Sequence, residues 1–65
     1  MLQYHEHVYT RDVVDFLMTQ RDQVASTDDI ADYLCHSSGA VREALMRLKK
    51  VNRVDEIIPN VWHLE

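Results

Sequence analysis

The stretch from residue 27 to residue 48 constrains the fold most, because its pattern predicts two helices joined by a short turn at 34–36. Thr27 is expected to cap the first helix, and the two aspartates that follow it suit the positive end of the helix dipole. Ser37 is the simplest cap for the second helix. Apolar residues recur at helical spacing in both segments: Ile30, Ala31 and Leu34, then Val41, Ala44, Leu45 and Leu48. The chain is therefore expected to fold around two closely packed helices.

The order of apolar and hydroxyl residues in this stretch resembles the helix-turn-helix of winged-helix proteins. The residues that carry the resemblance are Ile30, Ala31, Leu34, Ser37, Val41, Leu45 and Leu48. The chain departs from the family at Cys35, where glycine is common, and at His36, where an apolar residue is common. The resemblance implies a mainly α (α+β) fold, a three-helix winged helix-turn-helix with a short C-terminal β-hairpin, the wing. In such proteins the third helix usually enters the DNA major groove and the wing touches the DNA backbone, with no enzymatic activity.

The residues before this stretch predict a first helix and a short strand. Thr10 is expected to cap a helix that runs to about Gln20, with Phe16 at the edge of the core. The expected buried stripe of this helix is Val13, Val14, Leu17 and Met18. Residues 24–25 lie where winged-helix domains often place a short first strand.

The residues after the stretch predict a hairpin. The third helix is expected to end near Asn52, because asparagine tolerates the left-handed backbone found at helix ends. Two β-prone runs, 54–58 and 61–64, then surround a Pro-Asn pair that is typical of a turn. Trp62, the largest apolar side chain, is expected to fold back over the helices and close the core.

The length predicts one small domain. A chain of 65 residues buries a marginal core, so contacts with a partner or a second copy could add to its stability. We expect an N-terminal arm or short strand at 1–9, the winged helix-turn-helix domain at 10–63, and a tail at 64–65 that resembles a vector-derived sequence. The single cysteine cannot form an internal disulfide, and no run reaches the roughly 20 apolar residues of a membrane span. A cytoplasmic protein with no membrane segment is therefore expected.

Two histidines in the N-terminal arm raise the question of a metal site. His5 and His7 could share an ion on one side of a strand, but they lack the second spaced pair of ligands that is typical of zinc sites. The sequence also lacks catalytic triad spacing, a glycine-rich phosphate loop and a paired-carboxylate site. We therefore expect no metal, no other cofactor and no enzymatic activity.

Charge is distributed unevenly along the chain. The net charge of the whole chain is −4, which argues against a generic nucleic-acid binder. Residues 42–53, however, hold five basic residues and one acidic residue, a net charge of +4, whereas residues 1–41 sum to −5. The basic segment is the predicted third helix and its exit, where DNA phosphates would be met.

A helical wheel with about 100° per residue predicts which side chains of the third helix face outward. Gly39 permits close approach to a DNA backbone, and the two serines before it can donate to phosphates. Arg42 can reach a guanine edge, Met46 can read shape or a thymine methyl group, and Glu43 repels phosphates unless it accepts from a cytosine amine. The expected DNA-binding residues are Ser37, Ser38, Gly39, Arg42, Met46, Arg47 and Lys50.

Two functions fit these observations. The first is a small DNA-binding transcription regulator that uses residues 38–50 as its recognition helix, with double-stranded DNA as its partner. It is expected to act as a homodimer, because one module of this size makes few contacts. The alternative is a winged-helix protein–protein interaction module, since the wing tip carries no lysine or arginine and follows Asp55 and Glu56. Its expected partner-binding patch is Met46, Ile57 and Ile58.

Overall fold

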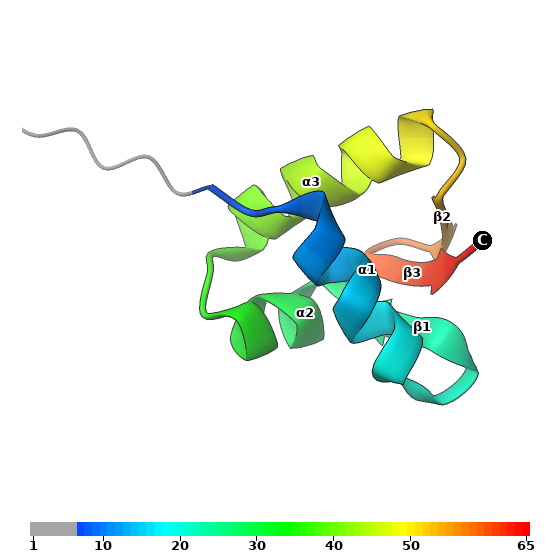
Figure 1. Cartoon of the computed structure of the whole chain (residues 1–65), viewed down its shortest axis with the longest axis horizontal. Helices are drawn as coiled ribbons and strands as arrows, with labels where there is room; N and C mark the ends of the chain where they lie inside the picture. Colours follow the sequence, from blue (N-terminus) through cyan, green and yellow to red (C-terminus); the bar gives the residue numbers. More distant parts are fainter. Residues whose placement is uncertain (1–6) are drawn as a thin grey trace, which may run out of the picture.

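Three helices and a small antiparallel sheet make up residues 7–65, the part of the chain that the computed structural model describes (Figure 1). The elements are α1 (Thr10–Thr19), the 3-10 turn η1 (Arg21–Gln23), β1 (Val24–Ser26), α2 (Thr27–Leu34), α3 (Ser38–Lys50), β2 (Val54–Ile58) and β3 (Val61–Leu64). The prediction of an α+β domain with three helices and a C-terminal hairpin is confirmed. Both hairpin strands begin and end where the β-prone runs predict.

The sheet is larger than the predicted hairpin, because β1 adds to it and gives the strand order β1-β3-β2. β3 lies in the centre and is antiparallel to both neighbours, so that Trp62 is opposite Ala25 on one side and Glu56 on the other. The pairing of β2 with β3 shifts register between Glu56 and Ile58, which is a bulge just before the turn. The short strand expected at 24–25 therefore ties the region between α1 and α2 to the hairpin.

The core is formed by the buried faces of the helices and the sheet. Its largest fully buried side chains are Trp62, Leu17, Ile30, Leu45, Val13, Val41 and Val54. Two residues of the predicted core, Val14 and Leu34, are only partly buried against it. Val8 and Leu64 are buried as well, and Leu64 pairs with Val54 in the sheet. The core therefore includes side chains close to both ends of the described residues.

The buried stripe of α1 differs from the prediction at Met18. Met18 is 59% exposed, whereas Phe16 is buried and its ring lies 4.5 Å from the ring of Tyr33 in α2. Val13, Phe16 and Leu17 are spaced at three and four residues, so they share one face of the helix, and Met18 lies about 100° beyond Leu17. The prediction of a buried Met18 was wrong because the buried face of α1 is centred on Val13, Phe16 and Leu17.

Two predicted helix caps were also wrong. Tyr9, and not Thr10, precedes α1, and no side chain caps that helix. At α2 the cap is Ser26, whose hydroxyl oxygen accepts the backbone N–H of Asp29 at 3.0 Å. Thr27 is instead the first residue of the helix and is buried, because its hydroxyl group contacts the hairpin.

The turn between α2 and α3 is formed by a residue in the left-handed conformation. Cys35 has a φ of 59°, the left-handed conformation that glycine commonly adopts at a helix end. The backbone N–H of His36 donates to the carbonyl of Ala31 at 3.0 Å, which satisfies the end of α2. Ser37 caps α3 as predicted, and Asn52 has a φ of 61° just beyond the end of that helix, as expected. Cys35 therefore ends α2 in a conformation that glycine adopts more readily than other residues.

Most of the N-terminal arm expected at 1–9 lies outside the described residues. His5, one of the two histidines considered for a metal site, lies outside them as well. Of the described part, Val8 packs into the core. No helix among residues 7–65 is long and apolar enough to cross a membrane.

Candidate functional site

The outward face of α3 carries a shallow hollow of about 390 Å³. Its lining residues are Gly39, Arg42, Glu43, Met46, Arg47 and Lys50. They face outward because α3 buries Val41, Ala44, Leu45 and Leu48 on its opposite side, as the wheel predicts. Three cationic side chains and one carboxylate line this hollow, on a chain whose net charge is −4. The outward face of α3 is therefore a basic surface on an acidic chain.

Gly39 leaves this surface open near the start of α3. A Cβ atom built at this position would meet nothing within 4 Å, and the backbone does not adopt the positive φ that favours glycine. Glycine within a helix is less stable than alanine by roughly 0.5–1 kcal/mol. The packing of the described residues thus gives no reason for a missing side chain at Gly39.

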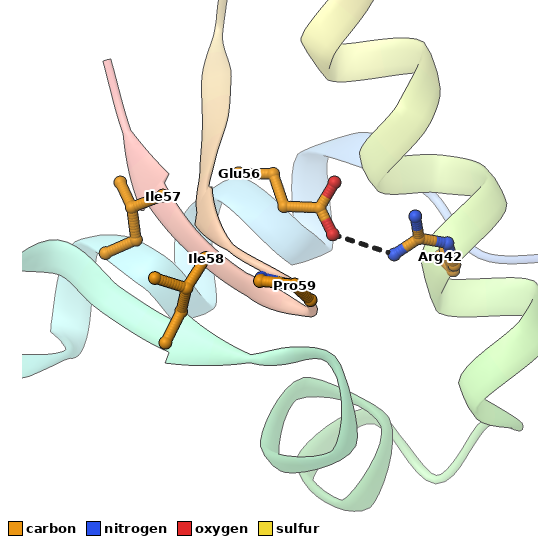
Figure 2. Close-up of a pocket in the computed structure, with 5 residues that line it drawn as sticks. All are labelled: Arg42, Glu56, Ile57, Ile58 and Pro59. Carbon is orange, nitrogen blue, oxygen red and sulfur yellow. Dashed lines mark hydrogen bonds and ion pairs between the residues drawn. The ribbon is translucent and has the colours of Figure 1, made fainter.

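Arg42 does not point freely into solvent, because it is held by the hairpin. Its Nη1 atom donates to Oε2 of Glu56 at 3.1 Å and to Oδ1 of Asn60 at 2.7 Å. Figure 2 shows the guanidinium group reaching from α3 to the carboxylate on β2. The same group lies 5.5 Å from the ring centroid of Trp62, within the range of a cation–π contact. Arg42 therefore connects α3 to the hairpin, which is not the placement expected for a reader of guanine.

The hydrogen bonds of Arg42 continue into the buried base of the hairpin. The indole Nε1–H of Trp62 donates to Oγ1 of Thr27 at 2.8 Å. The hydroxyl O–H of Thr27 in turn donates to Oδ1 of Asn60 at 3.2 Å. The backbone N–H of Thr27 donates to the carbonyl of Asn60 at 2.9 Å. Glu56 accepts the backbone N–H of Asn60 at 2.8 Å. These five residues, which we call the hairpin network, join the start of α2, the middle of α3 and the turn.

The carboxylate of Glu56 is stabilised in its charged form by this network. The backbone N–H of Asn60, and then the side chain of Arg42, hold the pKa of Glu56 below its ordinary value. A carboxyl group whose pKa is lower in the folded state stabilises that state above its unfolded pKa. The stabilisation is lost as the pH falls through the folded pKa.

The stability difference between wild type and Glu56→Gln is therefore expected to depend on pH. At about pH 7 the wild type should be the more stable protein, because the glutamine lacks the charge that Asn60 and Arg42 favour. The difference should shrink as the pH falls below the ordinary glutamate pKa of about 4.3 and then through the lower folded-state pKa of Glu56, where the side chain becomes neutral like glutamine. Urea denaturation of both proteins at a series of pH values measures this difference. An unchanged difference between about pH 7 and pH 3 would contradict the assigned role of the carboxylate.

Other predicted site residues also make contacts within residues 7–65. The Ser37 hydroxyl oxygen is the cap of α3, and Oγ of Ser38 donates to Oδ1 of Asp28 at 2.8 Å. Nη2 of Arg47 lies 3.4 Å from the carbonyl oxygen of Val8, to which it donates. A phosphate that binds Ser38 would therefore compete with Asp28. Lys50 is exposed in the last turn of α3.

The hairpin carries a second, apolar surface. Ile57 is 50% exposed and Ile58 is 60% exposed, and both line an open hollow of about 450 Å³ together with Arg42, Glu56 and Pro59. In Figure 2 the two isoleucines point away from the Arg42 side chain. Met46, by contrast, lines the hollow on α3. The predicted patch of Met46, Ile57 and Ile58 is thus divided between two surfaces, both of which include Arg42.

Sequence reasoning missed the hairpin network. The sequence predicts Thr27 as a helix cap, Glu56 as a charged residue beside the wing tip, and Asn60 as a turn residue. Asn60 does adopt a turn conformation, with a φ of 63°. Its contacts with Thr27 and Arg42 join residues 33 and 18 positions apart, and no local pattern signals contacts of that kind.

No group of three or more His, Cys, Asp or Glu residues that could hold a metal ion occurs between His7 and Glu65. Comparison with known proteins finds no matching family model, no matching curated protein and no matching solved structure.

Proposed function

We propose that the chain is a winged helix-turn-helix domain that binds double-stranded DNA through the outward face of α3. The arrangement is supported by the order of the elements, in which α2 and α3 are joined by a short turn and followed by a two-stranded wing, β2 and β3. The left-handed Cys35 and the Ser37 cap supply the turn geometry that the motif needs. α3 is then the recognition helix.

One observation carries the functional proposal, namely the charge of the α3 hollow. Arg42, Arg47 and Lys50 surround it on a chain that is otherwise acidic. Long-range attraction of a polyanion depends on such a concentration of positive charge, and phosphate contacts supply most of the non-specific affinity for DNA. Gly39 lets a backbone approach the start of the helix. The wing adds little to the affinity for DNA, because its tip carries no cation. The cation that lines the hollow beside the tip is Arg42, which belongs to α3.

A second function is favoured by the exposure of Ile57 and Ile58. Two half-exposed isoleucines beside a hollow are typical of a protein-binding surface. In this alternative the hairpin binds a protein partner or a second copy, and α3 has no ligand. A homodimer that binds DNA would also need a contact between its two copies.

Titration of labelled duplexes of random sequence at low ionic strength tests the proposal. Wild type should bind weakly and lose affinity steeply with added salt. Lys50→Ala should weaken binding to all duplexes alike and reduce the salt slope by about one. Arg21→Ala is the matched control, because Arg21 lies in η1 and lines neither hollow, so the same loss of charge should have a much smaller effect.

The two functions differ in their response to changes at the hairpin. Replacing Ile57 and Ile58 with serine should leave binding by a single domain nearly intact. The absence of wild-type binding to any duplex would contradict the proposal. Sedimentation of the wild type and the serine variant then tests whether these isoleucines mediate self-association.

A further inference from the structure

The two arginines that flank the outward line of α3 are both engaged with neighbouring segments. Arg42 donates to Glu56 and Asn60 of the hairpin, and Arg47 donates to the carbonyl of Val8 before α1. On the helical wheel Arg42 and Arg47 lie on opposite sides of the line that includes Glu43. The side chains of the hollow that remain for an outside ligand are therefore those of Glu43, Met46 and Lys50.

Glu43 is an unusual residue for this place. It is exposed, it is the one acidic residue among those that line the hollow, and within residues 7–65 the structure records no hydrogen bond or ion pair for its carboxylate. A carboxylate beside DNA phosphates weakens general affinity, because like charges repel. Glu43 on a DNA-binding face is explained if it lowers the affinity for all DNA sequences but makes a favourable contact with one particular sequence.

The chemistry of a carboxylate selects one kind of base edge. An ionised carboxylate only accepts hydrogen bonds, so it is repelled by the O6 and N7 acceptors of guanine. Donors in the major groove are the exocyclic amines of cytosine and adenine, and the adenine amine lies beside the N7 acceptor. Cytosine therefore offers a carboxylate the better partner.

We infer that Glu43 is a specificity-determining residue that accepts a hydrogen bond from the N4 amine of a cytosine. This inference rests on the proposed function, since it assumes that α3 enters the major groove. The open position at Gly39, one turn before Glu43, allows the helix to come close enough for a short side chain to reach a base edge. Arg42 is then a positioning residue that holds the hairpin against α3.

Replacement by glutamine tests whether Glu43 recognises cytosine, because Glu43→Gln keeps the size of the side chain and removes its charge. Glutamine makes two hydrogen bonds to adenine, through N6 and N7. The test is selection of duplexes from a random pool by wild type and variant, followed by sequencing. Wild type should enrich cytosine at one position, and the variant should change that preference to adenine by roughly 5- to 160-fold. The variant should also bind random duplex more tightly, because a repulsive charge is gone.

Glu65→Gln is the matched control, because it removes the same charge from the far end of the chain, where the carboxylate lies 3.5 Å from His63. It should leave the selected sequence unchanged. If Glu43 only formed a helix pair with Arg47 four residues later, Glu43→Gln would shift the melting temperature without changing the selected base.

The possible failures are distinguishable. Selection of the same sequence by wild type and Glu43→Gln would overturn the inference and leave the proposed function standing. Failure of the wild type to recover any duplex from the pool would overturn both.

Discussion

Leu45→Ala is expected to lower the free energy of unfolding by about 2 to 5 kcal/mol, the range found for leucine truncations in packed cores. Leu45 is fully buried in α3, so the truncation removes apolar contacts and leaves a cavity that rigid neighbours cannot fill. Native domains are stable by only roughly 5 to 15 kcal/mol, and a chain of 65 residues belongs near the lower end. A large part of the variant should therefore be unfolded at physiological temperature.

Urea denaturation followed by the fluorescence of Trp62 measures this loss. Met46→Ala is the control, because Met46 is the next residue of α3 and is 38% exposed. It should cost less than about 1 kcal/mol. Equal stabilities of the two variants would contradict the register of α3, and with it the face assigned to the ligand.

Thr27→Val is expected to cost about 1 to 3 kcal/mol, although valine has nearly the shape of threonine. The hydroxyl oxygen of Thr27 accepts from the buried Nε1–H of Trp62, and the O–H of Thr27 donates to Oδ1 of Asn60. Without that oxygen the indole N–H stays buried with no acceptor, and leaving a buried donor unpaired costs more than a typical hydrogen bond contributes. The turn should also lose part of its attachment to α2.

The same substitution at Thr10 provides a control. Thr10 is likewise the first residue of its helix, but no side-chain cap bond forms at α1. Thermal denaturation of the two variants should show a clearly lower melting temperature for Thr27→Val. A double variant with Trp62→Phe tests the pairing itself, because removing both partners should cost less than the two single changes added together. Strict additivity would contradict the assigned hydrogen bond.

Much of the fold follows from local patterns in the sequence. The spacing of Val41, Leu45 and Leu48 identifies the buried face of α3, because a regular helix repeats its face about every 3.6 residues. The same regularity places Gly39 and Lys50 on the outward face, and both line the α3 hollow. The hairpin is marked by β-prone runs on both sides of a turn pair, which is also a local signal.

Features that depend on distant residues could not be predicted in this way. Ser26 and Thr27 are adjacent hydroxyl residues, and either can cap a helix. The choice between them is made by Trp62, which lies 35 positions away and draws the Thr27 hydroxyl inward. The direction of the long side chain of Arg42 is likewise determined by Glu56, 14 positions later. Helical periodicity therefore predicts which residues of α3 face outward, while tertiary hydrogen bonds decide which side chains of that face have no partner within the described residues.

The proposal that α3 binds duplex DNA is tested by the backbone amide chemical shifts of the labelled protein during titration with a short duplex at low ionic strength. We expect the shifted amides to cluster in α3, from Ser38 to Lys50, with little change at Ile57 and Ile58. Shift changes confined to the hairpin, or no change at any duplex concentration, would contradict the assignment of α3 as the DNA-binding element.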